Sequence, residues 1–226
     1  MYRLIYFMIL LPAIFLALFL LSRLRRKTTN ELEKVLYLQN DPQLFLKLLA
    51  NPKLKILYRK STLLQFELNA YLLSGDDLQI ERVTGLLDAM AMTKGESLEY
   101  QQKKLSYYCS KGDKAKAEAA LNRIESILSK AKGDQARFIL KESRIIFGVY
   151  IEHDTKLIKE LEKAQMKEKG AVRGITLYRL AKLCYFDGDY KKAQAYLLEA
   201  KEMLHNTAWF DIVELALIDM SVFDRF

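Results

Sequence analysis

Cysteine and histidine are scarce in this chain, and their scarcity excludes several kinds of site. The 226 residues contain two cysteines, Cys109 and Cys184, and two histidines, His153 and His205. A zinc ribbon or a thioredoxin-type site needs a Cys-x-x-Cys pair, which is absent. No His-Glu-x-x-His motif, phosphate-binding glycine loop or Gly-x-Ser-x-Gly motif occurs either. We therefore expect no catalytic residue, no metal site, no cofactor and no small-molecule substrate, and we predict that the protein is not an enzyme.

Acidic residues are missing from the N-terminal region, and this explains most of the net charge. The formal charge is +8, and no Asp or Glu precedes Glu31. Residues 28–226 hold 31 Lys and Arg against 28 Asp and Glu, so most of the excess lies in residues 1–27. A nucleic-acid-binding protein clusters its positive charge on one face or stripe of the folded domain. We therefore expect no nucleic-acid partner.

Residues 4–22 form an apolar run without a charge. Nineteen residues of helix reach about 28 Å, close to the roughly 30 Å thickness of a bilayer core. Pro12 lies in the middle of the run, where a transmembrane helix tolerates it. A cleaved signal peptide is the alternative, but the run is long, only Arg3 precedes it and no small-x-small cleavage site follows. We predict that residues 1–27 are a transmembrane anchor with a basic flank.

The flanks of this run predict its orientation. One Arg precedes the run, and four basic residues follow it: Arg23, Arg25, Arg26 and Lys27. Positive charge is retained on the cytoplasmic side, so we expect the N-terminus outside and residues 23–226 in the cytoplasm. The four cations are also placed to bind anionic lipid headgroups. The Lys-rich, Trp-poor composition and the single anchor indicate a bacterial inner or plasma membrane; a mitochondrial outer-membrane receptor with the same layout is the alternative.

Proline is almost absent after the anchor, and the two prolines that remain mark helix starts. Pro42 follows Asp41 and Pro52 follows Asn51, and an Asx cap followed by Pro is typical of a helix N-terminus. No alternating Val/Ile/Thr run bounded by turn residues predicts a strand. We therefore predict an all-α chain in which Pro42 opens a helix through about residue 50.

A short turn ending in Asp recurs along the chain. Counted between the aspartates, the spacings are 35, 37, 41 and 35 residues. Gly75, Gly112 and Gly188 are expected to end the preceding helix in a left-handed conformation, and the aspartate of each turn to cap the next helix. A helix–turn–helix recurring at about 34 residues is typical of a helical array, with an irregular bundle as the alternative. The turns are Asn40-Asp41, Gly75-Asp76, Gly112-Asp113, His153-Asp154 and Gly188-Asp189, and Gly133-Asp134 has the same pattern.

The last hairpin, Gly174–Asn206, resembles the tetratricopeptide repeat (TPR) family. The matching residues are Leu177, Leu180, Ala181, Tyr185, Gly188, Asp189, Tyr190, Ala193 and Ala200. An earlier hairpin is similar at Leu105, Tyr108, Ala117 and Leu121, and the resemblance extends in weaker form over about residues 30–206. The predicted fold of residues 28–226 is an α-solenoid of about five TPR-like hairpins, with the helix at 207–219 as a C-terminal cap. Another α-solenoid of similar geometry is the alternative. The two aromatics in residues 222–226 either pack against the fold or protrude.

The resemblance implies where a partner binds, because the first helix of each TPR repeat lines a concave groove. The groove positions in this sequence are Tyr178, Lys182, Tyr185, Phe186, Phe147, Tyr150, Gln102 and Ser106. The aromatics among them are core candidates as well, and Tyr178 and Lys182 fit either role. Gln65 and Asn69 stand where carboxylate-clamp TPR proteins carry charged residues, so that specificity is not supported.

These observations together predict a membrane-anchored, non-enzymatic scaffold or adaptor that holds a protein partner near the bilayer. Two other functions fit the same features. One is a structural subunit that packs permanently into a larger membrane complex, and the other is a regulator of a membrane-bound enzyme or protease.

Overall fold

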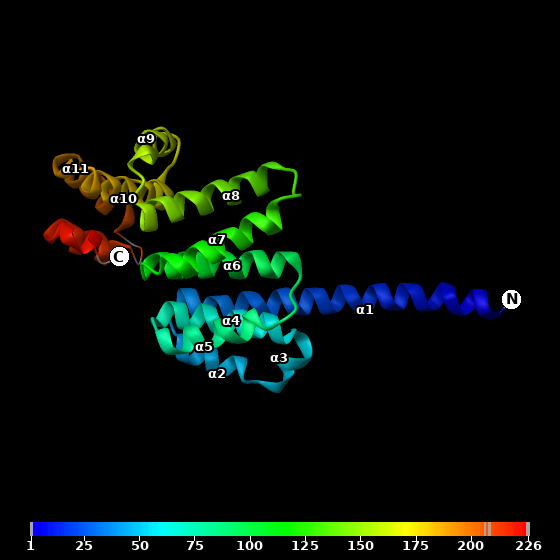
Figure 1. Cartoon of the computed structure of the whole chain (residues 1–226). Helices are drawn as coiled ribbons and strands as arrows, with labels where there is room; N and C mark the ends of the chain where they lie inside the picture. The colour runs from blue at the N-terminus through cyan, green and yellow to red at the C-terminus, as the bar shows by residue number, and fades with distance from the viewer. Residues whose placement is uncertain (1, 206, 208, 225–226) are drawn as a thin grey trace. The chain divides into compact units, whose positions relative to one another are not determined.

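The computed structural model of the chain describes residues 2–205, 207 and 209–224, with side chains from residue 14 onward. Every regular element within these ranges is helical, so the prediction of an all-α chain is confirmed (Figure 1). The chain folds into two compact units, residues 1–96 (unit 1) and residues 97–226 (unit 2). The predicted division into an anchor at 1–27 and a repeat domain at 28–226 stays a prediction, because the first helix continues across residue 27.

Unit 1 begins with a long helix and continues with short ones. Its elements are α1 (Tyr2–Glu33), the π-helical turn η1 (Lys34–Leu38), α2 (Pro42–Leu49), α3 (Pro52–Leu57), α4 (Lys60–Ser74) and α5 (Asp77–Asp88). α2 and α3 begin at the two prolines, as predicted, each after an Asx side chain that accepts a backbone N–H bond. The core of this unit is formed by Leu32, Leu36, Phe45, Leu49, Leu54, Leu57 and Ala70.

Only the C-terminal part of α1 packs in this core, and the helix is tied there by hydrogen bonds. Arg25 Nε donates to the carbonyl of Leu57 at 2.7 Å, and the Tyr58 hydroxyl donates to the carbonyl of Arg25 at 2.8 Å. No helix in the part of the chain that the structure describes is long and apolar enough to cross a bilayer. The span predicted at residues 4–22 includes residues 4–13, whose side chains lie outside those described.

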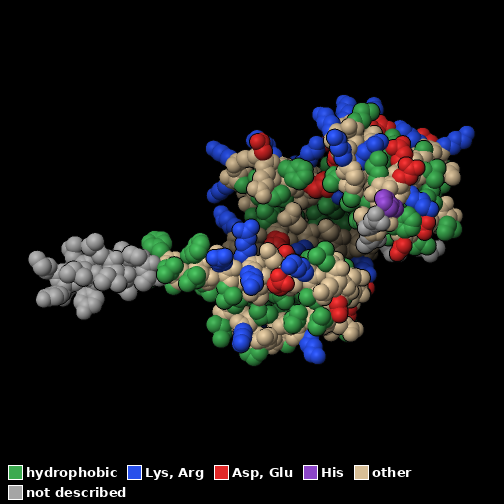
Figure 2. All heavy atoms as spheres, turned by 180° about the vertical axis from the view of Figure 1, so that it is seen from behind, with side chains coloured by type: hydrophobic (Ala, Val, Ile, Leu, Met, Phe, Trp, Pro, Cys, Tyr) green, Lys and Arg blue, Asp and Glu red, His purple; other side chains and the backbone are tan. Residues whose placement is uncertain are grey.

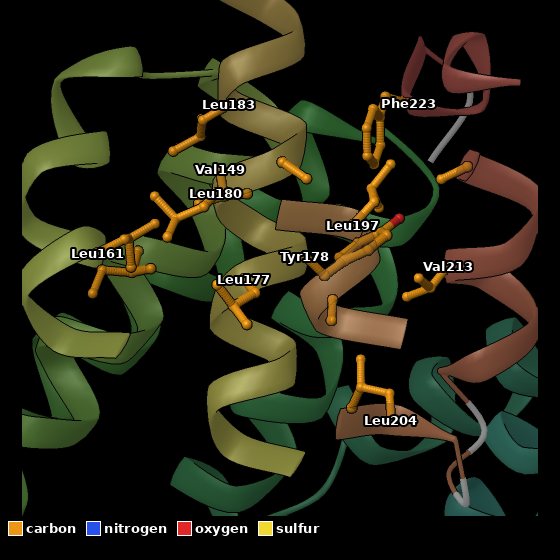
Figure 3. Packing of buried hydrophobic residues seen from close by; sticks show 14 residues of the cluster. Val149, Leu161, Leu177, Tyr178, Leu180, Leu183, Leu197, Leu204, Val213 and Phe223 are labelled. Atoms are coloured by element: carbon orange, nitrogen blue, oxygen red, sulfur yellow. The ribbon is translucent and has the colours of Figure 1, made fainter. Parts of the chain in front are cut away.

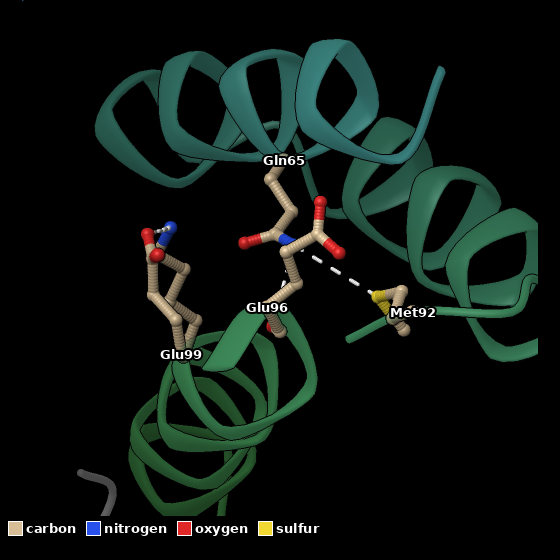
Figure 4. A network of polar contacts seen from close by, with 5 residues as sticks. Gln65, Met92, Glu96 and Glu99 are labelled. Atoms are coloured by element: carbon tan, nitrogen blue, oxygen red, sulfur yellow. Dashed lines mark hydrogen bonds and ion pairs between the residues drawn. The ribbon is translucent and has the colours of Figure 1, made fainter. Parts of the chain in front are cut away.

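The boundary of unit 1 is held by a polar network around Glu96 (Figure 4). The Glu96 carboxylate accepts from the backbone N–H of Thr93 at 2.9 Å, a capping box that starts the next helix and lowers the pKa of Glu96. Gln65 is buried; its Nε2 donates to the Glu96 carbonyl at 3.3 Å and contacts Met92 Sδ at 3.8 Å. The Gln65 side chain therefore serves the fold of unit 1.

Unit 2 contains the remaining helices. They are α6 (Lys94–Ser110), α7 (Lys114–Leu128), α8 (Asp134–Phe147), the π-helical turn η2 (Gly148–Glu152), the 3₁₀ turn η3 (Thr155–Leu157), α9 (Ile158–Gln165), α10 (Gly170–Phe186), α11 (Tyr190–Leu204), α12 (Phe210–Ile218) and the 3₁₀ turn η4 (Met220–Asp224). The largest core of the unit surrounds α10, whose residues Leu177, Leu180 and Leu183 are fully buried (Figure 3). A second core joins α6, α7 and the end of α8.

The recurrent turns have the structure that the sequence predicts. Each of the five aspartates accepts a hydrogen bond from a backbone N–H two or three residues ahead, over 2.8 to 3.1 Å. The residue before each aspartate is left-handed, including His153 at φ 51°, which stands where Gly is usual. Five helix-ending and helix-starting signals are therefore confirmed; their aspartates are Asp41, Asp76, Asp113, Asp154 and Asp189.

The sixth turn, Gly133-Asp134, differs from the other five. α8 does begin at Asp134, but the Asp134 side chain forms no cap hydrogen bond and instead pairs with Arg137 one turn later. Gly133 is also not the end of the preceding helix, because α7 ends at Leu128. The prediction that this pair both ends one helix and caps the next was therefore wrong: Asp134 is the first residue of α8, and its carboxylate pairs with Arg137.

The predicted C-terminal helix is present as α12, and the segment after it folds back. Val213 and Ala216 of α12 are buried, and Trp209 and Leu217 pack partly buried against the same core. Phe223 in η4 is 1% exposed, which settles the alternative left open for this residue: it packs against the fold.

Candidate partner-binding site

The predicted groove face of α10 is covered by the C-terminal turn η4. Phe223 packs against Tyr178 and Tyr185, with ring centroids 5.5 Å apart in both cases. Lys182 Nζ donates to the carbonyl of Phe223 at 2.6 Å, and the Tyr185 hydroxyl donates to Asp224 Oδ2 at 2.9 Å. The face of α10 thus holds a short aromatic and acidic peptide segment, and this segment belongs to the chain itself.

Lys182 is an unusual member of this face because its ammonium is fully buried among rings. Its Nζ lies 5.3 Å from the centroid of Phe186 and 5.7 Å from that of Tyr150, so cation–π attraction supplements the hydrogen bond to η4. Burial lowers the pKa of Lys182 to about 8, and the carboxylate of Asp224 only partly opposes this. Burial, together with the same positive charge, lowers the pKa of His153, whose ring stacks on Phe186.

A hollow of about 220 Å³ opens beside this covered face. Two of the predicted groove residues, Ser106 of α6 and Tyr150 of η2, line it. The rest of the wall comes from Ser110 and Ile146, which lie close in sequence to these two residues, and from the distant Arg179 and Trp209. The structure therefore brings one serine and one tyrosine of the predicted groove together around a single concave space.

Two polar atoms in the wall of this hollow are buried. The Tyr150 hydroxyl and the Nε of Arg179 are buried without a well-aligned hydrogen-bond partner among the described residues, and the two side chains interact chiefly with each other. The other end of the Arg179 guanidinium is paired, with Nη1 2.6 Å from Glu142 Oε1. Burial raises the pKa of Tyr150, which the nearby Arg179 charge only partly opposes, so the phenol is protonated and offers a donor. The hollow therefore has a buried phenol and a buried guanidinium in its wall, next to the apolar surfaces of Ile146 and Trp209.

The other predicted groove residues have separate places. Tyr178 and Lys182 are buried beneath η4, and neither is accessible to a partner while η4 is docked. Phe147 is buried in the core between α6, α7 and α8, and Gln102 is half-buried on α6. Their role in binding stays a prediction.

The membrane-flank residues are all exposed, in unit 1. Arg25 forms the hydrogen bond to Leu57 described above, and its three companions are Arg23, Arg26 and Lys27.

A second, larger hollow of about 530 Å³ lies along α7, α8 and η2. Its charged walls largely neutralise one another. Arg144 pairs with Glu125 at 2.8 Å, and Lys141 pairs with Glu160 at 2.6 Å. This hollow therefore offers less unsatisfied polar chemistry than the smaller one.

The structure offers little for metal or redox chemistry. Within residues 2–205, 207 and 209–224, no three His, Cys, Asp or Glu side chains come together as a metal site would need. Cys109 and Cys184 are buried, and burial raises their thiol pKa values to about 12 and about 11. A thiol in such surroundings stays protonated and is a poor nucleophile.

Sequence reasoning missed three residues of this region: Arg179, Trp209 and Phe223. Arg179 follows Tyr178 and so lies on a neighbouring face of α10, and no local signal distinguishes it, because α10 also carries Arg173 and Lys182. Comparisons with protein-family models, with curated proteins and with solved structures find no match to the chain.

Proposed function

We propose that the chain is a membrane-anchored, non-enzymatic interaction protein that binds a protein partner at the membrane. In this proposal its helices form a TPR-like α-solenoid, and residues 4–22 span a bacterial inner or plasma membrane with the array on the cytoplasmic side. The anchor is supported by the uncharged N-terminal run and the cations after it. The array is supported by the five capped turns, which recur at 35 to 41 residues.

The observation that carries the binding function is the hollow lined by Ser106, Tyr150 and Arg179. A buried polar group without a partner costs about 1–3 kcal/mol, and this hollow contains two. A carbonyl or carboxylate oxygen of a ligand could accept from these donors once the Tyr150 or Arg179 side chain turns toward the hollow, because both atoms are buried in the present structure. Pockets for drug-sized molecules start at roughly 300 Å³, so 220 Å³ suits one side chain of a larger partner.

The neighbouring face of α10 supports the same function. It binds η4 through Lys182, Tyr185 and the ring of Phe223, which is how a groove receives an anchor residue of a peptide. Because η4 of the chain itself covers this face of α10, the face is not free for a partner. In the proposed complex the partner therefore binds first at the open hollow beside Ser106.

The proposal is tested with a photoreactive amino acid at Ser106 in the full chain, expressed in intact membranes. The matched control carries the same amino acid at Ser126, an exposed serine on α7 that does not line the hollow. We expect a protein adduct of defined mass from position 106 and not from position 126.

A second variant separates binding from misfolding. Tyr150→Phe removes one unsatisfied hydroxyl and leaves the packing of the ring unchanged, so the fold is retained. In the variant with the photoreactive group at 106, Tyr150→Phe should lower the adduct yield. Equal adducts from positions 106 and 126, or no adduct from either, would refute a binding role for this hollow.

A further inference from the structure

The helix α3 and the residues after it expose positive charge beside an isoleucine. Lys53, Lys55 and Lys60 are exposed, and Ile56 is 87% exposed, although it lies between the buried residues of α3. We call these four residues the α3 surface. None of the three lysines forms an ion pair among the residues that the structure describes, and no acidic residue occurs in the sequence from 42 to 66.

Unit 1 carries a charge asymmetry that is centred on this surface. Residues 23–60 contain 10 Lys and Arg against 3 Asp and Glu, whereas residues 61–96 contain 2 against 6. In Figure 2, basic and hydrophobic side chains lie side by side over the part of unit 1 where α1 enters it. We therefore call residues 23–60 the basic half of unit 1 and residues 61–96 its acidic half.

Hydrogen bonds join the C-terminal end of α3 to α1 near Arg25. Arg25 donates to the carbonyl of Leu57 at 2.7 Å, and Tyr58 donates to the carbonyl of Arg25 at 2.8 Å. The Thr29 hydroxyl lies 2.8 Å from the same tyrosine hydroxyl. In Figure 1, α3 lies at the end of unit 1 from which α1 projects. The backbone of α3 thus lies at the same end of unit 1 as the segment proposed to enter the membrane.

The level of this attachment matches the headgroup layer. Arg25 is three residues beyond Ser22, the end of the proposed span, and three residues of helix rise about 4.5 Å. The headgroup region adds roughly 5–7 Å on each side of the hydrocarbon core. If the span ends where the apolar run ends, the C-terminal end of α3 is at headgroup height.

We infer that the α3 surface is a second membrane contact, which docks on anionic phospholipid headgroups with Ile56 inserted among them. This inference rests on the proposed anchor and adds to it a fixed orientation of unit 1 on the bilayer. Each basic residue near an anionic leaflet strengthens attachment by about fivefold, and an exposed aliphatic side chain adds apolar burial. The negative surface potential of the anionic leaflet repels the acidic half of unit 1.

A small hollow gives one headgroup a place to bind. Lys55 and Lys60 line a space of about 360 Å³ together with Tyr58, Leu63, Leu64 and Glu67. Glu67 is the one acid there, and its carboxylate lies 3.6 Å from Arg82. The two lysines are therefore available to a lipid phosphate.

The test places a spin label at residue 56 of the full chain, through Ile56→Cys. The two native cysteines are buried, so labelling is directed to the new one. A matched control is Leu78→Cys, a 77% exposed leucine on α5 in the acidic half of the same unit. Both labelled proteins are reconstituted into vesicles of phosphatidylcholine alone or of phosphatidylcholine with phosphatidylglycerol. Collision of each label with oxygen and with a water-soluble nickel complex is then measured.

We expect the oxygen-to-nickel collision ratio at position 56 to be several-fold higher in the anionic vesicles than in the neutral ones, and the ratio at 78 to stay water-like in both. Replacement of Lys53, Lys55 and Lys60 by Gln should weaken the docked state by up to about a hundredfold, at fivefold per charge, and return the ratio at 56 to the value in neutral vesicles.

The two ways of failing are distinct. Protein that floats with the vesicles but gives equal, water-like ratios at 56 and 78 overturns the α3 contact and leaves the anchor intact. Protein that does not float with the vesicles overturns the anchor, and with it the second contact that depends on it.

Discussion

Phe223 packs against a buried lysine, and we therefore predict that Phe223→Ala lowers the free energy of unfolding unusually little for a buried phenylalanine. The phenylalanine is 1% exposed and covers Lys182, whose ammonium donates to the Phe223 carbonyl. Truncation of the ring removes the contacts to Tyr178 and Tyr185 and so loosens η4.

Two effects of opposite sign set the magnitude. A buried Phe→Ala substitution costs about 3–5 kcal/mol. Lys182 has a pKa of about 8 instead of 10.5, which corresponds to about 3 kcal/mol of burial penalty for its charged form below pH 8. When η4 undocks, water reaches the ammonium and most of this penalty is relieved. The net loss of stability should therefore be about 1–2 kcal/mol.

The control is Phe45→Ala in unit 1. Phe45 is also 1% exposed, but it is packed among leucines with no buried charge beneath it, so the full loss of about 3–5 kcal/mol is expected. Urea denaturation of both variants gives the stabilities. NMR titration of the Lys182 ammonium gives its pKa, which should rise from about 8 toward 10.5 in Phe223→Ala. A full loss in both variants, with the Lys182 pKa unchanged, would refute the reasoning.

Further predictions concern pH, packing and capping. Because the folded pKa of Lys182 lies below its unfolded value, the burial penalty is complete below pH 8 and fades as the pH rises toward 10.5. Between pH 8 and 10 the wild-type free energy of unfolding should thus rise relative to Lys182→Met, by at most about 1.4 kcal/mol per pH unit in denaturant titrations. Gly174→Ala should destabilise the fold by about 1–2 kcal/mol, because the new Cβ would lie 2.6 Å from a leucine side chain. Gly85→Ala, with open space around the new Cβ, should stabilise it by about 0.5–1 kcal/mol. Thermal melting temperatures that shift in the same direction for both variants would contradict this. Asp189→Ala should lower the free energy of unfolding by about 1 kcal/mol, because it removes a helix cap. Asp134→Ala removes no cap and should lower it by less than about 0.5 kcal/mol. Equal losses in denaturation followed by circular dichroism would disprove the distinction.

The sequence was sufficient where the determining interaction is local. An aspartate that caps a helix bonds to an amide two or three residues away, so the pattern alone located Asp76, Asp113 and Asp189 as caps. The same pattern gave a wrong prediction at Gly133-Asp134. There Gly133, at φ 150°, occupies the N-cap position of α8, so Asp134 is already the first helical residue. A Gly-Asp pair thus predicts the presence of a turn more reliably than it predicts which of the two residues is the cap of the next helix.

The candidate site was less predictable because its parts are far apart in sequence. The resemblance to TPR proteins placed Tyr178 and Lys182 on the groove face of a helix, but it did not show what covers that face. The covering segment is 41 residues away from Lys182. The hollow joins residues 106–110, 146–150, 179 and 209, and no single hairpin contains this set. The burial of Arg179 and Tyr150 depends on that long-range packing, so their unsatisfied donors become visible only in the folded chain.

Proximity labelling from the C-terminus in intact cells tests the central claim most directly. The full chain is compared with Ser106→Trp, which fills the hollow, and with Ser126→Trp, which adds the same ring to an exposed site outside it. We predict that one or more proteins labelled by the wild type and by Ser126→Trp disappear from the labelled set of Ser106→Trp, while all three chains stay in the membrane fraction. An identical labelled set for all three chains, or a wild-type chain recovered outside the membrane fraction, would contradict a membrane-anchored protein that binds its partner through this hollow.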